Sequence, residues 1–193
     1  RTVGRPGYLV LDTPNPSLRN ALDEMARHPE YDGVVITSEQ AAMTMRGGSV
    51  LIVVDTQRRH SMMTPQLLDI AGKVVLIDHH RRSVDSFEGA TLSHLEAGAS
   101  SACEMVTEIL QYFDEAVKLT SFECDVLLAG IAVDTKHFVF NTGARTFEAA
   151  GFLRRSGADT RMVTEMFQDD MQTYRNRTRV VQQAQMIADE VAL

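Results

Sequence analysis

The sequence predicts an α/β fold: a mainly parallel sheet with helices on both faces, followed by a helical segment. Two observations indicate this class. Short apolar runs rich in β-branched residues recur before residue 80, with helix-like stretches between them. From about residue 98 onward that pattern stops, and apolar residues recur at helical spacing. Continuous apolar runs that alternate with helices are typical of parallel strands covered on both faces.

The expected strands occupy residues 8–11, 33–36, 50–54 and 74–77. The third and fourth are the clearest, because each is an unbroken apolar run that ends at an aspartate, Asp55 or Asp78. Ser17 and Ser38 are candidate N-caps for helices that follow the first two strands. Further helices are expected at residues 100–113, 121–133, 145–156, 159–167 and 171–191. The last, within about residues 170–193, is interpreted as a connector to a further segment.

Composition narrows the range of ligands. The formal net charge is −7, whereas proteins that track long nucleic acids gather Lys and Arg. We therefore expect no long nucleic acid as a partner, and a small phosphorylated ligand remains compatible. Cys103 and Cys124 are expected to be reduced and buried. No apolar run approaches the ~20 residues of a membrane span, so we expect no membrane contact by this chain itself.

Acids and histidines occur where the strands of the predicted sheet end. Asp55 closes one strand, Asp78 closes the next and is followed by His79 and His80, and Asp134 follows a later apolar stretch. Ligand sites in open α/β sheets lie at the carboxyl ends of the strands. Each acid alone also fits a helix cap or a loop residue. The combination favours a functional site.

Carboxylates and imidazoles are suitable ligands for Mn²⁺ and similar ions. A carboxylate with two oxygens can bridge a pair of metal ions about 3.5–4 Å apart. The set contains no thiolate, which disfavours a structural zinc site. The residue types therefore indicate a dinuclear site for hydrolysis at phosphorus.

Three segments resemble successive motifs of the DHH phosphoesterase superfamily: residues 53–56, 77–82 and 130–135. Three flanking segments are similar to the cyclic-di-AMP phosphodiesterases of the GdpP type: residues 11–17, 99–104 and 145–150. The resemblance runs from about residue 8 to residue 181. It implies Mn²⁺-dependent hydrolysis of cyclic di-AMP to linear pApA.

The resemblance also implies roles for individual residues. Asp55 would bridge two Mn²⁺ ions, with His79 and Asp134 binding metal beside it. Asp78 would orient a neighbouring histidine, as residues behind the ligands of a metal site do. His80 would contact a phosphate oxygen of the substrate.

Three more residues are candidates for substrate binding. Ser100 and Ser101 open a helical stretch, where backbone N–H groups can receive a phosphate. An ordinary serine cap with Glu104 as its capping-box partner explains the same residues equally well. Arg81 follows the histidine pair, and its guanidinium suits phosphate oxygens, with a solvated loop arginine as the alternative.

Two parts of the family pattern are not found. The first motif, a Gly-His run followed by Asp-x-Asp, does not precede Tyr8, and the C-terminal DHHA1 substrate domain does not follow Leu193. We therefore expect a truncated DHH core that holds about half of a dinuclear site and is poorly active alone. The resemblance implies a cytoplasmic domain of a membrane-anchored parent protein.

Two other functions remain open. A DHH-family oligoribonuclease or pAp phosphatase is possible because a shared core does not choose the substrate. A non-catalytic ligand-binding module would keep the fold without the chemistry. The expected partners are the small cyclic dinucleotide and a second copy of the chain in a homodimer.

Overall fold

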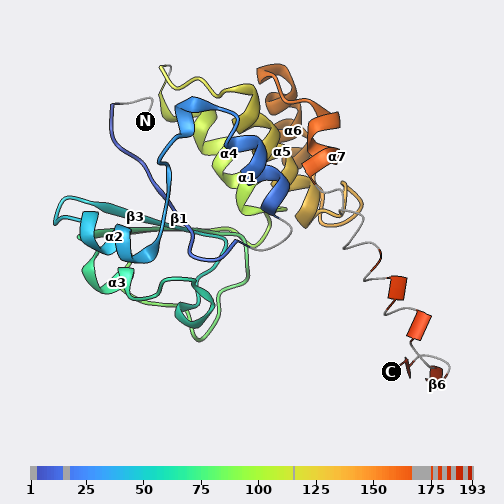
Figure 1. Cartoon of the computed structure of the whole chain (residues 1–193), viewed down its shortest axis with the longest axis horizontal. Coiled ribbons are helices and arrows are strands. Elements are labelled where there is room, and N and C mark those ends of the chain that lie inside the picture. The colour runs from blue at the N-terminus through green and yellow to red at the C-terminus, as the bar shows by residue number, and fades with distance from the viewer. Residues whose placement is uncertain are drawn as a thin grey trace.

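A computed structural model of the chain describes residues 4–14, 18–114 and 116–166, and short stretches at 175, 178–179, 182–183, 186–188 and 191–192. The strands are β1 (Leu9–Val10), β2 (Val35–Ile36), β3 (Val50–Val54), β4 (Lys73–Asp78), β5 (Leu92–Leu95), β6 (Met186–Ala188) and β7 (Val191–Ala192). The helices are α1 (Arg19–Met25), α2 (Ser38–Thr44), α3 (Leu67–Ile70), α4 (Ala102–Phe113), α5 (Ser121–Asp134), α6 (Ala144–Ser156) and α7 (Thr160–Met166). In Figure 1, α1 and α4–α7 gather in one group beside the sheet, and α2 and α3 lie away from that group.

The α/β part contains two parallel sheets. β3, β4 and β5 pair in that spatial order, and β1 pairs with β2 separately. Val54, the last residue of β3, lies opposite Ile77 of β4. The backbone N–H of Asp55 donates to the carbonyl of Ile77 at 2.9 Å, so the pairing reaches one residue beyond β3. The predicted fold class is confirmed, and β3 and β4 end at the same edge of the sheet.

Burial differs between the two central strands. Four of the six residues of β4 are buried, including Asp78 at its end. Along β3, Val50, Ile52 and Val54 are 50–59% exposed, while Val53 between them is buried. β3 lies at one end of the order β3-β4-β5, which leaves it fewer neighbours than the middle strand. The apolar run predicted burial on both faces, which holds for β4 and not for β3.

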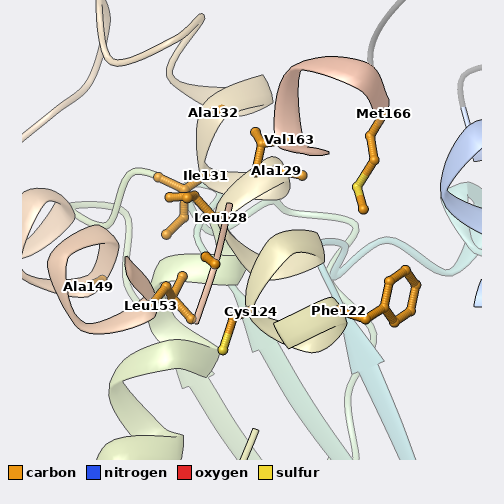
Figure 2. Close-up of a cluster of buried hydrophobic side chains, with 11 residues drawn as sticks. Phe122, Cys124, Leu128, Ala129, Ile131, Ala132, Ala149, Leu153, Val163 and Met166 are labelled. Atoms are coloured by element: carbon orange, nitrogen blue, oxygen red, sulfur yellow. The ribbon is translucent and has the colours of Figure 1, made fainter. Parts of the chain in front are cut away.

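Helix α5 is the centre of the helical part. Its buried side chains pack with Ala149 and Leu153 of α6 and with Val163 and Met166 of α7, as Figure 2 shows. α5 is apolar around most of its circumference, as expected for a helix enclosed by others. It ends at Asp134, which places this acid at the end of a well-packed helix.

Some details differ from the sequence prediction. The N-cap of α2 is Thr37 instead of Ser38, because the Thr37 hydroxyl accepts from the Gln40 N–H and the Gln40 side chain accepts in return. β5 was not predicted, since Leu-Ser-His-Leu contains too few apolar residues to indicate a strand. No helix among the described residues has both the length and the apolarity needed to cross a membrane.

The predicted C-terminal helix falls largely outside the described residues, as does Ser17. Near the end of the chain β6 and β7 pair antiparallel, so the helix predicted for residues 171–191 is wrong at residues 186–188 and 191. Ile187 and Val191 are β-branched, and such residues favour strands. The connector role of residues 170–193 stays a prediction.

Candidate metal centre

Acidic and imidazole side chains from three separate parts of the sequence meet at the carboxyl edge of the sheet. His79 Nε2 lies 3.3 Å from Asp55 Oδ1 and 3.9 Å from Asp134 Oδ2. His80 Nδ1 lies 4.0 Å from the same Asp55 oxygen. One ligand atom each from Asp55, His79 and His80 fall within 4.8 Å of one another. Two of the three residues predicted to bind metal, Asp55 and His79, therefore lie in one compact group, whose third member is His80. Asp134, the other predicted ligand, is outside that group and lies beside His79.

Asp55 occupies an unusual backbone conformation. Its φ is +63°, in the left-handed region that non-glycine residues seldom adopt and that aspartate tolerates better than most. The hydrogen bond to Ile77 fixes the residue at the point where β3 ends. Such strain persists where surrounding contacts impose it, and it is frequent at functional sites. Here the turn sets the carboxylate beside His79.

His79 is oriented with one ring nitrogen toward the acids. Its Nδ1 lies 3.4 Å from the carbonyl oxygen of Ala99, and its side chain is only 17% exposed. With a proton on Nδ1 that donates to Ala99, the lone pair of Nε2 points toward Asp55 and Asp134. Metal-binding histidines commonly donate their other N–H to a carbonyl in this way.

Asp78 anchors His80 from beneath the site. Its carboxylate is fully buried; Oδ1 lies 2.7 Å from His80 Nδ1, and Oδ2 accepts from Gln57 Nε2 at 2.9 Å. Burial raises the pKa of Asp78, but the hydrogen bonds from His80 and Gln57 outweigh it, so the pKa lies below its ordinary value. Asp78 is therefore ionised at neutral pH, and His80 keeps Nε2 for another ligand.

Gln57 is a part of the site that the sequence analysis missed. It is 2% exposed, and besides Asp78 its amide donates to the carbonyls of His80 and Arg81, both at 3.2 Å. Its oxygen accepts from the N–H of Ser83 at 3.1 Å. Gln57 thus fixes the loop that follows β4. Nothing in the sequence indicated these partners, which lie more than twenty positions away.

The predicted substrate-binding serines form the cap of α4. Ser101 accepts from the Glu104 N–H at 3.0 Å, and the Ser100 hydroxyl donates to the Glu104 carboxylate. Both serines are buried, so these contacts match the capping interpretation. Arg81 is exposed, and its backbone carbonyl is held by Gln57. Contact of Ser100, Ser101 or Arg81 with substrate stays a prediction.

Negative charge accumulates around the acids. Burial raises the pKa of Asp134, the charge of Asp55 raises it further, and His79 and His80 partly oppose the rise. Burial, followed by the charges of Asp134 and Asp55, raises the pKa of the Cys103 thiol to about 12. A cation bound between the carboxylates would relieve this repulsion. The donor set and its charge therefore fit a divalent metal ion.

Asp134→Asn should stabilise the metal-free protein and weaken its response to metal. The pKa of Asp134 is higher in the folded chain than its ordinary value of 3.8. Between 3.8 and the raised pKa the folded state binds more protons, so its stability falls as the pH rises through this window and stays at the lower level above it. Since Asp134 is partly exposed to solvent, we expect a modest rise in Tm at pH 7 with EDTA, about 2 °C.

The same thermal scans with Mn²⁺ should show a smaller metal-induced rise in Tm for Asp134→Asn than for the wild type. Asp23→Asn is the matched control, because Asp23 is exposed on α1. Its Tm should remain unchanged with EDTA and should rise with Mn²⁺ as in the wild type. A lower Tm for Asp134→Asn in EDTA would contradict the raised pKa of Asp134, which comes first from burial and then from the charge of Asp55.

The chain is similar to a protein family, to two named relatives and to a solved structure. The family model described as "DHH family, N-terminal domain" matches residues 7–131. The chain is 35% identical over 191 residues to the cyclic-di-AMP phosphodiesterase PdeA of Listeria monocytogenes, and 38% identical over 191 residues to the cyclic-di-AMP phosphodiesterase GdpP of Geobacillus thermodenitrificans. Each alignment covers 98% of this chain, which spans 29% of the length of each relative.

A solved structure shares the fold. The crystal structure of an exopolyphosphatase-related protein from Bacteroides fragilis superposes with a TM-score of 0.68 at 13% sequence identity. The alignment covers 96% of this chain and 63% of that chain. At this identity the likeness concerns the fold alone.

Proposed function

This chain belongs to the DHH family, and from that premise we propose that it forms part of the catalytic region of a metal-dependent phosphodiesterase that hydrolyses cyclic di-AMP to pApA. The family match covers residues 7–131 and confirms the resemblance seen in the sequence. The observation that carries the proposal is the position of His79 Nε2, 3.3 Å from Asp55 and 3.9 Å from Asp134.

We propose Mn²⁺ as the metal, with Asp55, His79 and Asp134 as ligands and two ions in the complete protein. Carboxylate and imidazole donors suit this ion, and we assign the bridging role to Asp55, whose Oδ1 lies 3.3 Å from His79 Nε2 and 4.0 Å from His80 Nδ1. When bound, such ions make water a better nucleophile and stabilise the charge that develops on the phosphoryl group.

The residues around the ligands would orient the substrate. His80, held at Nδ1 by Asp78, keeps its Nε2 for a hydrogen bond to a phosphate oxygen. Gln57 keeps Asp78 and the loop after β4 in place. Arg81 is exposed on that loop and would add positive charge near the phosphate.

The choice of substrate follows from the relatives. Both aligned relatives are named as cyclic-di-AMP phosphodiesterases, and they are 35–38% identical to this chain over nearly its whole length. The formal net charge of −7 also disfavours long nucleic acids. Since the three proposed ligands make up only part of a two-metal site, we further propose that the chain alone is poorly active. Two further predictions are that the chain is a cytoplasmic domain of a membrane-anchored parent protein and that it forms a homodimer.

The proposal is tested with the full-length protein, Mn²⁺ and chromatography of the nucleotide products. We expect conversion of cyclic di-AMP to pApA that stops with EDTA and resumes when Mn²⁺ is restored. Short oligoribonucleotides and pAp are the comparison substrates. Cleavage of these with cyclic di-AMP left intact would instead support an oligoribonuclease or pAp phosphatase. Tight binding of cyclic di-AMP without turnover would support a ligand-binding module.

A further inference from the structure

A glycine in α5 lies in very close contact with α4. Gly130 stands one helical turn before Asp134, and a Cβ built at this glycine would lie 2.2 Å from Cys103 Sγ and 3.1 Å from Cys103 Cβ. Cys103 belongs to the first turn of α4, two residues after the cap at Ser101. Residues four apart on a helix share a face. The contact therefore lies on the face of α5 that carries Asp134.

We propose that Gly130 and Cys103 form a spacer that sets the distance between α4 and α5, and thereby positions Asp134 against His79 in the metal centre. Gly130 is then a positioning residue that acts through Asp134. The inference rests on the proposed function, because it requires Asp134 to be a metal ligand.

The glycine has no other evident reason to stand in the middle of α5. Glycine is among the least favourable residues in a helix interior, and Gly130 is not among the glycines with positive φ. The backbone conformation at Gly130 is therefore one that other residues can adopt, and it does not explain why glycine occupies this position. Gly151 in α6 provides a contrast, because a Cβ there would meet only Arg155 Nη1 at 3.4 Å, an ordinary contact distance. Of these two helical glycines, only Gly130 lies so close to a neighbouring helix that a Cβ would clash with it.

A displaced α5 would carry Asp134 with it. The next residue, Thr135, is fully buried; its hydroxyl donates to the Ile131 carbonyl at 2.7 Å and accepts from the Phe138 N–H at 2.9 Å. Residues 136–138 then follow with left-handed φ values of 47–64°. The end of α5 is therefore tied to the turn that follows it. A shift forced at Gly130 reaches Asp134 one turn later, where His79 lies 3.9 Å away.

The test is Mn²⁺ affinity of the full-length protein, measured by titration with electron paramagnetic resonance of the free ion. Gly130→Ala should weaken Mn²⁺ binding by about 10-fold or more, the range seen when residues that support metal ligands are changed. Gly151→Ala is the matched control and should bind Mn²⁺ as the wild type does. Cys103→Ala alone should weaken the affinity less than Gly130→Ala does, because it leaves a small gap at the contact and introduces no clash.

Rescue distinguishes a spacer from general damage to the helix. The double variant Cys103→Ala with Gly130→Ala removes the atom nearest the new methyl group, and it should recover most of the lost affinity. Cys103→Met enlarges the side chain on the α4 side of the contact and should weaken Mn²⁺ binding as Gly130→Ala does. It provides a second variant for the test if Gly130→Ala folds poorly.

Two results separate the inference from the proposed function. Equal Mn²⁺ affinity of the wild type, Gly130→Ala and Cys103→Met would overturn the spacer and leave the metal centre standing. A wild-type protein that binds no Mn²⁺ would overturn both. A double variant that folds but binds as weakly as Gly130→Ala would also overturn the spacer, because relieving the contact would then restore nothing.

Discussion

Asp55→Ala in the full-length protein should abolish hydrolysis of cyclic di-AMP, with kcat/KM lower by about 10³-fold or more. Asp55 Oδ1 lies within 4.0 Å of a ring nitrogen of both His79 and His80, so its loss removes a group that both histidines share. The measurement is the initial rate of pApA formation at saturating Mn²⁺. Mn²⁺ titration of the same variant should show weaker binding.

The control for this variant is Asp23→Ala. Asp23 is exposed on α1, so its replacement changes the net charge equally without touching the metal centre. Its rate should equal that of the wild type. Asp55→Ala with wild-type turnover, and with its thermal stability unchanged, would exclude Asp55 as a ligand that the reaction needs.

Asp78→Ala should damage both stability and activity. The buried carboxylate bonds to His80 Nδ1 and Gln57 Nε2, and hydrogen bonds to a charged group contribute about 1.5–3 kcal/mol. We expect the free energy of unfolding of the metal-free protein to fall by about that amount in urea titrations. Activity should fall by about 10–100-fold, because His80 loses the partner that orients its ring.

The pH dependence gives a second test of the Asp78 interaction. Because the pKa of Asp78 is lowered on folding, its stabilising effect is present above the ordinary value of 3.8 and is lost as the pH falls through the folded pKa. The stability difference between the wild type and Asp78→Ala should therefore narrow at acidic pH. Asp85→Ala, an exposed acid on the following loop, should show no such difference. A gap that widens toward low pH would contradict the assigned hydrogen bonds.

The parts of the site that could be predicted follow from local patterns. β3 and β4 are unbroken apolar runs that end in acids, and parallel strands bring such ends to one edge of the sheet. Asp55 and Asp78 are therefore expected to lie together. Asp134 is different, because it ends a helix, and its expected position beside His79 came from the resemblance to a family.

Other parts depend on tertiary contacts that leave no local signal. Gln57 is a single polar residue in a loop, and its importance appears only with Asp78 and the loop after β4 folded around it. β5 forms from a weakly apolar segment because β4 offers it a partner. Ser100 fitted two interpretations in the sequence, and burial against Glu104 matches the capping one.

The most direct test of the account is anomalous diffraction at the manganese absorption edge from crystals of the full-length protein grown with Mn²⁺. We expect an anomalous peak that places a manganese ion within bonding distance of the Asp55 carboxylate and of Nε2 of His79, with Asp134 as a further ligand. A manganese peak elsewhere in the protein, with none bonded to Asp55 or His79, would contradict it.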